Sequence, residues 1–183
     1  MALASRPGGP HHRPHAVTGR RLPFDPVAEA RRQWEAHGWE DAAPGMAAVT
    51  SLMRAQQIVS ARVEEVLRPY GLTFARYEVL MLLVLSRRGT LPMARIGERL
   101  QVHPASVTNA VDRLEGQGFV RRAAHPTDRR TTLVELTDAG RAVAAKATDE
   151  LNASVFARPG LSPDAVEQLV AVLTRMRAEA GDF

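Results

Sequence analysis

The chain has 183 residues, a net charge of +4 and no cysteine. This length suits one domain with arms. The absence of cysteine excludes a disulfide framework, a thiol redox switch and a thiolate metal site. No apolar stretch of about 18 residues occurs, and residues 1–22 lack the apolar core of a signal peptide. We therefore expect no transmembrane helix, no membrane partner and a cytoplasmic location.

The positive charge is concentrated in two segments. Residues 1–22 contain four arginines and no acid, and residues 86–137 contain nine arginines and five acids. The remaining segments contain slightly more acids than cations. A basic block between mildly acidic flanks is the charge pattern expected when arms that do not bind nucleic acid flank a segment that does.

The first third of the chain predicts a tail and two helices. Residues 1–22 are rich in Pro, Gly, Arg and His without hydrophobic periodicity, which predicts a disordered basic tail. Residues 23–45 are expected to form an extra helix, from about Pro26 to His37, and a linker. From Met46, apolar residues recur every three or four positions, which predicts a long amphipathic helix ending near Pro69–Gly71.

The next part, about residues 72–137, predicts a compact lobe. Thr73 is a suitable N-cap for a helix whose Val79–Leu85 stretch is apolar on every side, so we expect this helix to be fully buried. A helix of roughly eight residues, with Ile96 and Leu100, follows.

A second short helix then begins after a tight turn at Val102–His103. Pro104 suits its first position, where a missing N–H costs nothing, and Gly116 or Gly118 suits its end. The residues expected on its buried side are Val107, Val111 and Leu114. The polar or small residues expected on its outer side are Ala105, Ser106, Thr108, Asn109, Asp112 and Arg113.

This pair of helices predicts a helix-turn-helix, whose second helix fits the major groove of DNA. Asn and Arg can contact adenine and guanine edges, and Ser, Thr and Ala can contact phosphates or a thymine methyl group. The residues that we expect at the DNA from this helix are Pro104, Ala105, Ser106, Thr108, Asn109 and Arg113. Asp112 is more simply explained by an ion pair with a neighbouring arginine, because it would repel phosphate.

A β-hairpin is predicted next, with strands at Phe119–Ala124 and Thr131–Leu136 and a polar tip between them. Arg129 and Arg130 lie in the tip, where a cation can enter the narrow minor groove beside the site. Further phosphate contacts are expected from Arg121 and Arg122. The alternative is that these arginines are solvated surface residues.

Two helices are predicted to end the chain. Thr137-Asp138 caps the first, Pro159-Gly160 interrupts it, and a second helix begins after Ser162. The helices at 46–69 and 138–182 have more apolar surface than a small monomer can bury, so we expect them to form a homodimer interface.

Two segments resemble the MarR family of winged helix-turn-helix transcriptional regulators. Asp128–Gly140 resembles the D-x-R…L-T-x-x-G signature of the wing, and Val107–Val120 resembles the recognition helix and the start of the wing. The similarity covers about residues 46–180. It implies a mainly α (α+β) fold, a winged helix-turn-helix with long dimerisation helices at both ends. It also implies that Asp128 pairs with Arg130 and that the wing arginines reach the minor groove.

The resemblance also implies a pocket for a small-molecule effector where the dimer helices meet the lobe. The segments Tyr77–Leu80 and Val102–Pro104 resemble a subgroup associated with aconitate-type carboxylates. Because a carboxylate ligand needs a partly buried Arg or His, the candidate ligand-binding residues include Arg54, Arg76, Arg95 and His103, together with Tyr77. Surface ion pairs are the simpler explanation of these cations.

Trp34 matches a tryptophan of a urate-responsive subset of the family that has an added N-terminal helix. The other three positions of that subset are Glu78, Leu85 and Ala110 here, and two of them lack the expected cation. Urate is therefore not favoured, although Trp34 stays a candidate ligand contact, with core packing as the alternative.

Metal binding and catalysis have little support. No two histidines lie at i, i+4 on a predicted helix, and three of the six lie in the tail. Glu64 and Glu65 are adjacent, so they point to different helix faces. No phosphate loop, glycine fingerprint or nucleophile triad is present. We therefore expect no metal, no cofactor and no enzyme activity.

The sequence thus predicts a homodimeric regulator that binds a palindromic operator in double-stranded DNA. We expect a repressor released by an unknown small molecule, an anionic carboxylate or an aromatic compound. The alternatives are a winged-helix module for protein interaction without specific DNA binding, and a metal-responsive regulator.

Overall fold

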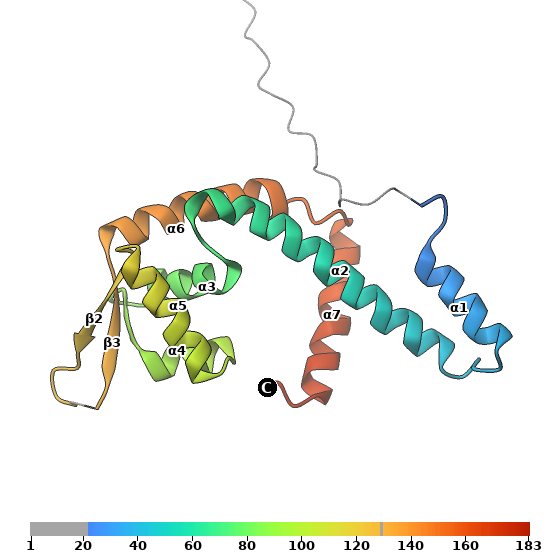
Figure 1. The fold of residues 1–183 in the computed structure, drawn as a ribbon, viewed down its shortest axis with the longest axis horizontal. Coiled ribbons are helices and arrows are strands. Elements are labelled where there is room, and N and C mark those ends of the chain that lie inside the picture. Colours follow the sequence, from blue (N-terminus) through green and yellow to red (C-terminus); the bar gives the residue numbers. More distant parts are fainter. Residues whose placement is uncertain (1–21, 129) are drawn as a thin grey trace, which may run out of the picture. The chain divides into compact units, whose positions relative to one another are not determined.

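A computed structural model describes residues 22–128 and 130–183 of the chain. Except for Leu22, the predicted basic tail lies outside the described residues, and so does Arg129. Within these ranges no helix is both long enough and apolar enough to cross a membrane. The chain divides into two compact units, one that ends at Val59 and one from Ser60 to Phe183. Figure 1 shows the helices and strands in chain order.

The first unit contains helix α1 (Pro26–Ala36) and the beginning of α2 (Ala43–Leu67). The carboxylate of Asp25 caps α1 by accepting the N–H of Val27 at 2.9 Å, so the predicted extra helix is confirmed. Helix α2 begins three residues earlier than Met46, because Pro44 fits the first helical turn, where a backbone N–H needs no partner.

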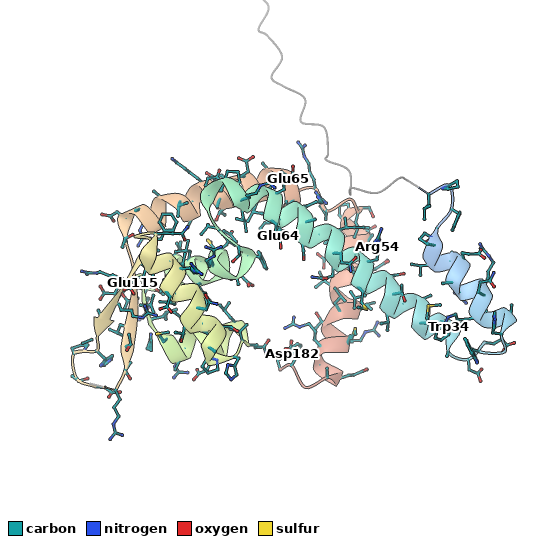
Figure 2. The ribbon with its side chains drawn as sticks, viewed as in Figure 1. Trp34, Arg54, Glu64, Glu65, Glu115 and Asp182 are labelled. Atoms are coloured by element: carbon teal, nitrogen blue, oxygen red, sulfur yellow. The ribbon has the colours of Figure 1, made fainter. Side chains whose placement is uncertain are left out.

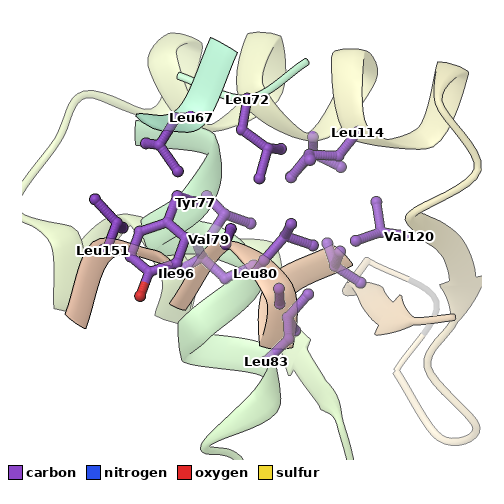
Figure 3. Packing of buried hydrophobic residues seen from close by; sticks show 14 of the residues in the cluster. Leu67, Leu72, Tyr77, Val79, Leu80, Leu83, Ile96, Leu114, Val120 and Leu151 are labelled. Atoms are coloured by element: carbon purple, nitrogen blue, oxygen red, sulfur yellow. The ribbon is translucent and has the colours of Figure 1, made fainter. Parts of the chain in front are cut away.

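The core of the second unit surrounds α3 (Phe74–Val84). This helix is contacted by α4 (Met93–Leu100), α5 (Pro104–Gly116), α6 (Asp138–Leu151) and strand β3 (Thr132–Leu136). Thr73 is its N-cap, as predicted. The labelled side chains in Figure 3 belong to this core, and they are Leu67, Leu72, Tyr77, Val79, Leu80, Leu83, Ile96, Leu114, Val120 and Leu151. The expectation that α3 is fully buried is wrong, because Met81 and Leu82 inside the helix are only half-buried and its ends are exposed. Phe74 is 42% exposed and Leu85, just past the last turn, is 77% exposed.

Helices α4 (Met93–Leu100) and α5 (Pro104–Gly116) form the predicted helix-turn-helix. Gln101 ends α4 in the left-handed conformation, with φ of 54°. Its Nε2 atom donates a hydrogen bond to the carbonyl oxygen of Asp182. Only three residues separate the two helices, and the N-terminal half of α5 lies at the surface of the lobe.

The sheet has three antiparallel strands in the order β1-β3-β2, namely β1 (Thr90–Pro92), β2 (Val120–Ala124) and β3 (Thr132–Leu136). The hairpin of β2 and β3 confirms the sequence prediction, and we call Val120–Leu136 the wing. Strand β1 was not predicted. It is too short to show an alternating pattern, and its proline is tolerated because β1 lies at the edge of the sheet.

The chain ends with α6 (Asp138–Leu151), the π-helical turn η2 (Asn152–Phe156) and α7 (Pro163–Glu179). The predicted helix from Thr137 is confirmed, although its last turn is a π-helix rather than an α-helix. Nη2 of Arg62 donates to the carbonyl oxygens of Ser154 and Arg158, at 3.0 and 2.9 Å. This arginine of α2 therefore satisfies carbonyl groups that the end of a helix leaves without partners.

The first turn of α6 lies against the turn between α5 and β2. The hydroxyl of Thr137 donates to the carbonyl oxygen of Gly118 at 2.7 Å and accepts the N–H of Gly140 at 3.0 Å. A Cβ atom at Gly140 would clash with the carbonyl oxygen of Phe119 and would lie 2.9 Å from Cδ1 of Leu136. Only glycine fits here, because a side chain would collide with backbone that cannot move away.

We predict that Gly140→Ala destabilises the folded chain by about 2–3 kcal/mol, because the new methyl group overpacks this junction. Thermal or urea unfolding measures the change. Gly116→Ala is the matched control, since nothing lies within 4 Å of its Cβ position. We expect the control to change stability by less than about 1 kcal/mol. Equal stabilities of the two variants would contradict the close approach.

Candidate nucleic-acid interface

Helix α5 presents one apolar and one polar face, as the sequence predicted. Val107, Val111 and Leu114 are at most 3% exposed. The predicted DNA-contacting residues of this helix are all exposed, and they are Pro104, Ala105, Ser106, Thr108, Asn109 and Arg113. The structure therefore brings the six together on one face, where a groove of DNA has access to them.

Side chains at the start of α5 form hydrogen bonds within the described part of the protein, whereas two side chains further along its polar face do not. His103 caps the helix, with its Nδ1 atom accepting the N–H of Ala105 at 3.2 Å. The hydroxyl of Thr108 donates to the carbonyl oxygen of Pro104 at 3.1 Å. Within residues 22–128 and 130–183, the side chains of Asn109 and Arg113 make no hydrogen bond or ion pair. These two are therefore the groups best able to bind a base edge or a phosphate.

The tip of the wing is organised by two side chains that accept backbone hydrogen bonds. Nδ1 of His125 accepts the N–H groups of Thr127 and Asp128, at 3.4 and 3.2 Å. The carboxylate of Asp128 accepts the N–H of Arg130 at 3.0 Å and the hydroxyl of Thr131 at 2.6 Å. These hydrogen bonds, first that from Thr131, hold the pKa of Asp128 below its ordinary value.

The expected pairing of Asp128 with Arg130 is made in the described residues by the backbone N–H of Arg130, and its guanidinium group stays exposed. A short turn favours this contact, since an acidic side chain easily reaches an N–H two residues further on. The predicted DNA contact Arg129 lies outside the described residues. The contribution of His125 was not predicted, because an isolated histidine in the sequence gave no signal of its partners.

The two arginines of β2, expected as phosphate contacts, are both paired with carboxylates. Nη2 of Arg121 lies 2.7 Å from Oε2 of Glu135, directly across the sheet. Arg122 lies between two acids of α5, with Nη2 at 2.5 Å from Oδ1 of Asp112 and Nη1 at 2.5 Å from Oε2 of Glu115. The expected ion pair of Asp112 with a neighbouring arginine is therefore confirmed, whereas the part of Glu115 was missed.

Glu115 also accepts the backbone N–H of Arg122, at 2.8 Å to its Oε1 atom. This hydrogen bond and those from the guanidinium group lower the pKa of Glu115 below its ordinary value. Glu115 lies on α5 (Figure 2) and Arg122 on β2, so these hydrogen bonds join the helix to the wing.

The candidate ligand residues have separate local partners. Tyr77 is buried, and its hydroxyl lies 3.0 Å from that of Thr148. Nε of Arg76 donates to Thr73 at 3.2 Å, and Arg95 forms an ion pair with Glu98 at 2.9 Å. The simpler explanation, a surface ion pair, therefore applies to Arg95.

The remaining candidates are Trp34, Arg54 and the capping residue His103. Trp34 lines a surface pocket in the first unit with Gly38, Trp39, Asp41 and Ala42. Its ring lies edge-on to that of Trp39, with 5.2 Å between the ring centroids. None of the other five candidates lines this pocket, and Arg54 is exposed on α2. The described part of the chain also contains no group of three or more His, Asp or Glu residues placed to bind a metal ion.

Comparison with known proteins gives one consistent family. The family model described as MarR family matches residues 72–132, which include α3, α4, α5 and β2. The chain is 33% identical over 89 residues to the HTH-type transcriptional regulator MhqR of Bacillus subtilis (strain 168). That alignment covers 49% of this chain and 60% of MhqR, so the chain spans less than two thirds of this relative.

Solved structures match over a larger part of the chain. Sco5413, a MarR family transcriptional regulator from Streptomyces coelicolor, is 50% identical, with a TM-score of 0.69 over 76% of this chain and 97% of that one. Sco3205, a MarR family transcriptional regulator from the same organism, was solved in complex with DNA. It is 29% identical, with a TM-score of 0.63 over 73% of this chain and 85% of that one.

We predict that Glu115 titrates below the ordinary pKa of a glutamate and that Arg122→Gln moves this pKa part of the way back up, because the substitution removes the guanidinium hydrogen bond and keeps the backbone one. A carboxyl group whose pKa is lowered by folding stabilises the folded state above its ordinary pKa, and this contribution is lost as the pH falls through the lowered value. Carbon-13 NMR of the side-chain carboxyl carbon measures the titration. An unchanged midpoint in the variant would contradict the contact between Glu115 and Arg122.

Proposed function

Because this chain belongs to the MarR family of transcriptional regulators, we propose that it is a sequence-specific DNA-binding protein. The single observation that carries this proposal is the polar face of α5, which is exposed and is followed directly by a wing. A helix of this kind fits the major groove, while the wing reaches the neighbouring minor groove. The DNA complex of Sco3205, 29% identical to this chain, supports DNA as the partner.

The proposed contacts differ in what they contribute. Asn109 and Arg113 contact base edges, because their side chains can form paired hydrogen bonds and are not engaged elsewhere in the described residues. The N-terminal turn contacts phosphates or a thymine methyl group through Pro104, Ala105, Ser106 and Thr108. Arg129 and Arg130 enter the minor groove, and Asp128 shapes the tip that carries them.

We propose a homodimer with the following division of the chain. Residues 72–137 bind DNA, and the helices at 46–69 and 138–182 form the dimer interface. None of the residues of α7 is buried, and its apolar Leu169, Val170, Val172 and Met176 are 45–55% exposed. Such a surface supports association with a second copy. Two-fold symmetry then requires a palindromic operator with half-sites about one helical turn (~10 bp) apart.

We further propose repression that a small molecule relieves by changing the separation of the two recognition helices. An aromatic or carboxylate compound is the proposed effector, contacted by some of the candidate residues Trp34, Arg54, Arg76, Tyr77, Arg95 and His103. We also propose a cytoplasmic location, because a repressor of this type must reach chromosomal DNA. The tail at residues 1–22 would add phosphate affinity without sequence preference.

The test is selection of binding sites from a randomised DNA library, followed by affinity measurements at several salt concentrations. We predict enrichment of a palindrome, and a loss of about 5- to 100-fold in affinity for it on Asn109→Ala or Arg113→Ala. Arg31→Ala removes the same charge from α1, outside the proposed DNA-binding and dimer segments, and is the control, with no loss in discrimination. Equal affinity for the selected site and random DNA at every salt concentration would contradict the proposal.

The proposed dimer is tested separately by sedimentation. Leu169 and Met176 lie two helical turns apart on one face of α7, and Glu167 lies on the opposite face. We predict that the double substitution Leu169→Glu and Met176→Glu yields monomers at concentrations where the natural sequence is dimeric. Glu167→Lys should leave the dimer intact. A dimer that survives the double substitution would contradict the proposed interface.

A further inference from the structure

Arg122 is the residue that joins the recognition helix to the wing. We infer that it is a positioning residue, which makes α5 and the wing move as one rigid DNA-binding unit. This inference rests on the proposed DNA binding and adds the origin of its specificity. In it, contacts in the major and minor grooves are energetically coupled through the Arg122 cluster, by which we mean Arg122, Asp112 and Glu115.

The geometry of the Arg122 cluster suits this task. Asp112 and Glu115 are three residues apart, so their carboxylates lie on the same face of α5. One guanidinium group donates to both, with each N···O distance at 2.5 Å. Glu115 accepts in addition the backbone N–H of Arg122 at 2.8 Å. Three bonds that differ in direction fix both the position and the rotation of the strand relative to the helix.

The covalent connection alone leaves a hinge. Gly118, between α5 and β2, has φ of +75°, and nothing lies within 4 Å of its Cβ position. Backbone hydrogen bonds join α5 to the base of the wing through Phe119, whose N–H donates to Leu114 and whose carbonyl oxygen accepts the N–H of Thr137, and β1 pairs with β3 as far as Leu133. The Arg122 cluster lies further along β2. It therefore adds a direct link between α5 and β2, which the pairing of β1 with β3 does not supply.

Arg122 is the most shielded side chain of the cluster. The Arg122 side chain is 27% exposed, whereas the adjacent Arg121 side chain is 74% exposed. Arg121 pairs with Glu135 of β3, so it joins two strands of the wing and makes no link to α5. Both arginines lie on β2 and pair with carboxylates, but only Arg122 is linked to α5, so Arg121 is a matched control for Arg122.

The sign of one result separates positioning from simple electrostatics. Asp112 and Glu115 are acids on the DNA-binding helix, so removing their charge reduces repulsion of phosphate. If Arg122 were a phosphate contact held back by these acids, Asp112→Asn with Glu115→Gln would raise affinity for every DNA. If Arg122 positions the wing, the same double substitution lowers the ratio of specific to random affinity, although affinity for random DNA does not fall.

The first experiment measures that ratio in the full chain. We expect a fall of about 5- to 20-fold for the acid double variant and for Arg122→Gln. Arg122→Lys should recover only part of the loss, because an ammonium group cannot bind two carboxylates in the fixed geometry of a guanidinium group. Arg121→Gln should leave the ratio within about twofold. A parallel rise in specific and random affinity would overturn the inference.

The second experiment is a double-mutant cycle with Arg130→Ala, whose side chain lies at the wing tip. In the natural sequence this substitution should weaken specific binding several-fold, and in the Arg122→Gln background it should have almost no further effect. Additive effects would overturn the inference. If the natural chain does not distinguish its selected site from random DNA, it is the proposed function that fails.

A measurement without DNA tests the rigid connection even if the proposed DNA binding fails. Amide nitrogen-15 relaxation reports the motion of the wing relative to α5 on the nanosecond and faster timescale. We expect lower order parameters at Ala124 and Thr132 in Asp112→Asn and in Arg122→Gln, but not in Arg121→Gln. Because Asp112 is exposed, its variant is expected to fold even if Arg122→Gln does not. Unchanged order parameters in a folded Asp112→Asn would contradict the rigid connection.

Discussion

The lobe depends on one close approach, between the first turn of α6 and the turn that connects α5 to β2. Gly140 lies against the carbonyl oxygen of Phe119, and Thr137 bonds to both sides of the contact. Because these are backbone atoms, the approach cannot be relaxed by moving a side chain. It fixes where α6 begins relative to α5 and β2, and α6 in turn packs on the buried helix α3. This gives a physical reason for the glycine of the L-T-x-x-G pattern.

The rest of the lobe follows from that joint. The apolar residues of α5 pack toward α3, which leaves the polar face of α5 at the surface. The wing starts next to the joint, where β1 pairs with β3, and the Arg122 cluster links β2 directly to α5. In this account the specificity of DNA binding depends on side chains that do not touch DNA, because they determine the relative placement of those that do. The arginines of β2 illustrate the point, since both were expected to bind phosphate and both are paired with carboxylates of the protein.

The parts predicted correctly from the sequence are those with a local signal. Pro104 and the spacing of Val107, Val111 and Leu114 predicted both the position and the buried face of α5. Strand β1 was missed because a three-residue strand is defined by its partner β3, more than 40 positions away in the register Thr90↔Glu135. The Arg122 cluster was missed for a similar reason. Seven positions separate Glu115 from Arg122, and only the turn geometry brings them together.

The central claim is that α5 lies in the major groove with the wing beside it in the minor groove. Chemical footprinting of the chain on its selected DNA tests this most directly. Dimethyl sulfate reports guanine N7 in the major groove, and hydroxyl radicals report the minor groove and backbone. The account predicts two major-groove protections about one helical turn (~10 bp) apart, each with an adjacent minor-groove protection that Arg130→Ala removes. Protection without this arrangement, or the same footprint on random DNA, would contradict it.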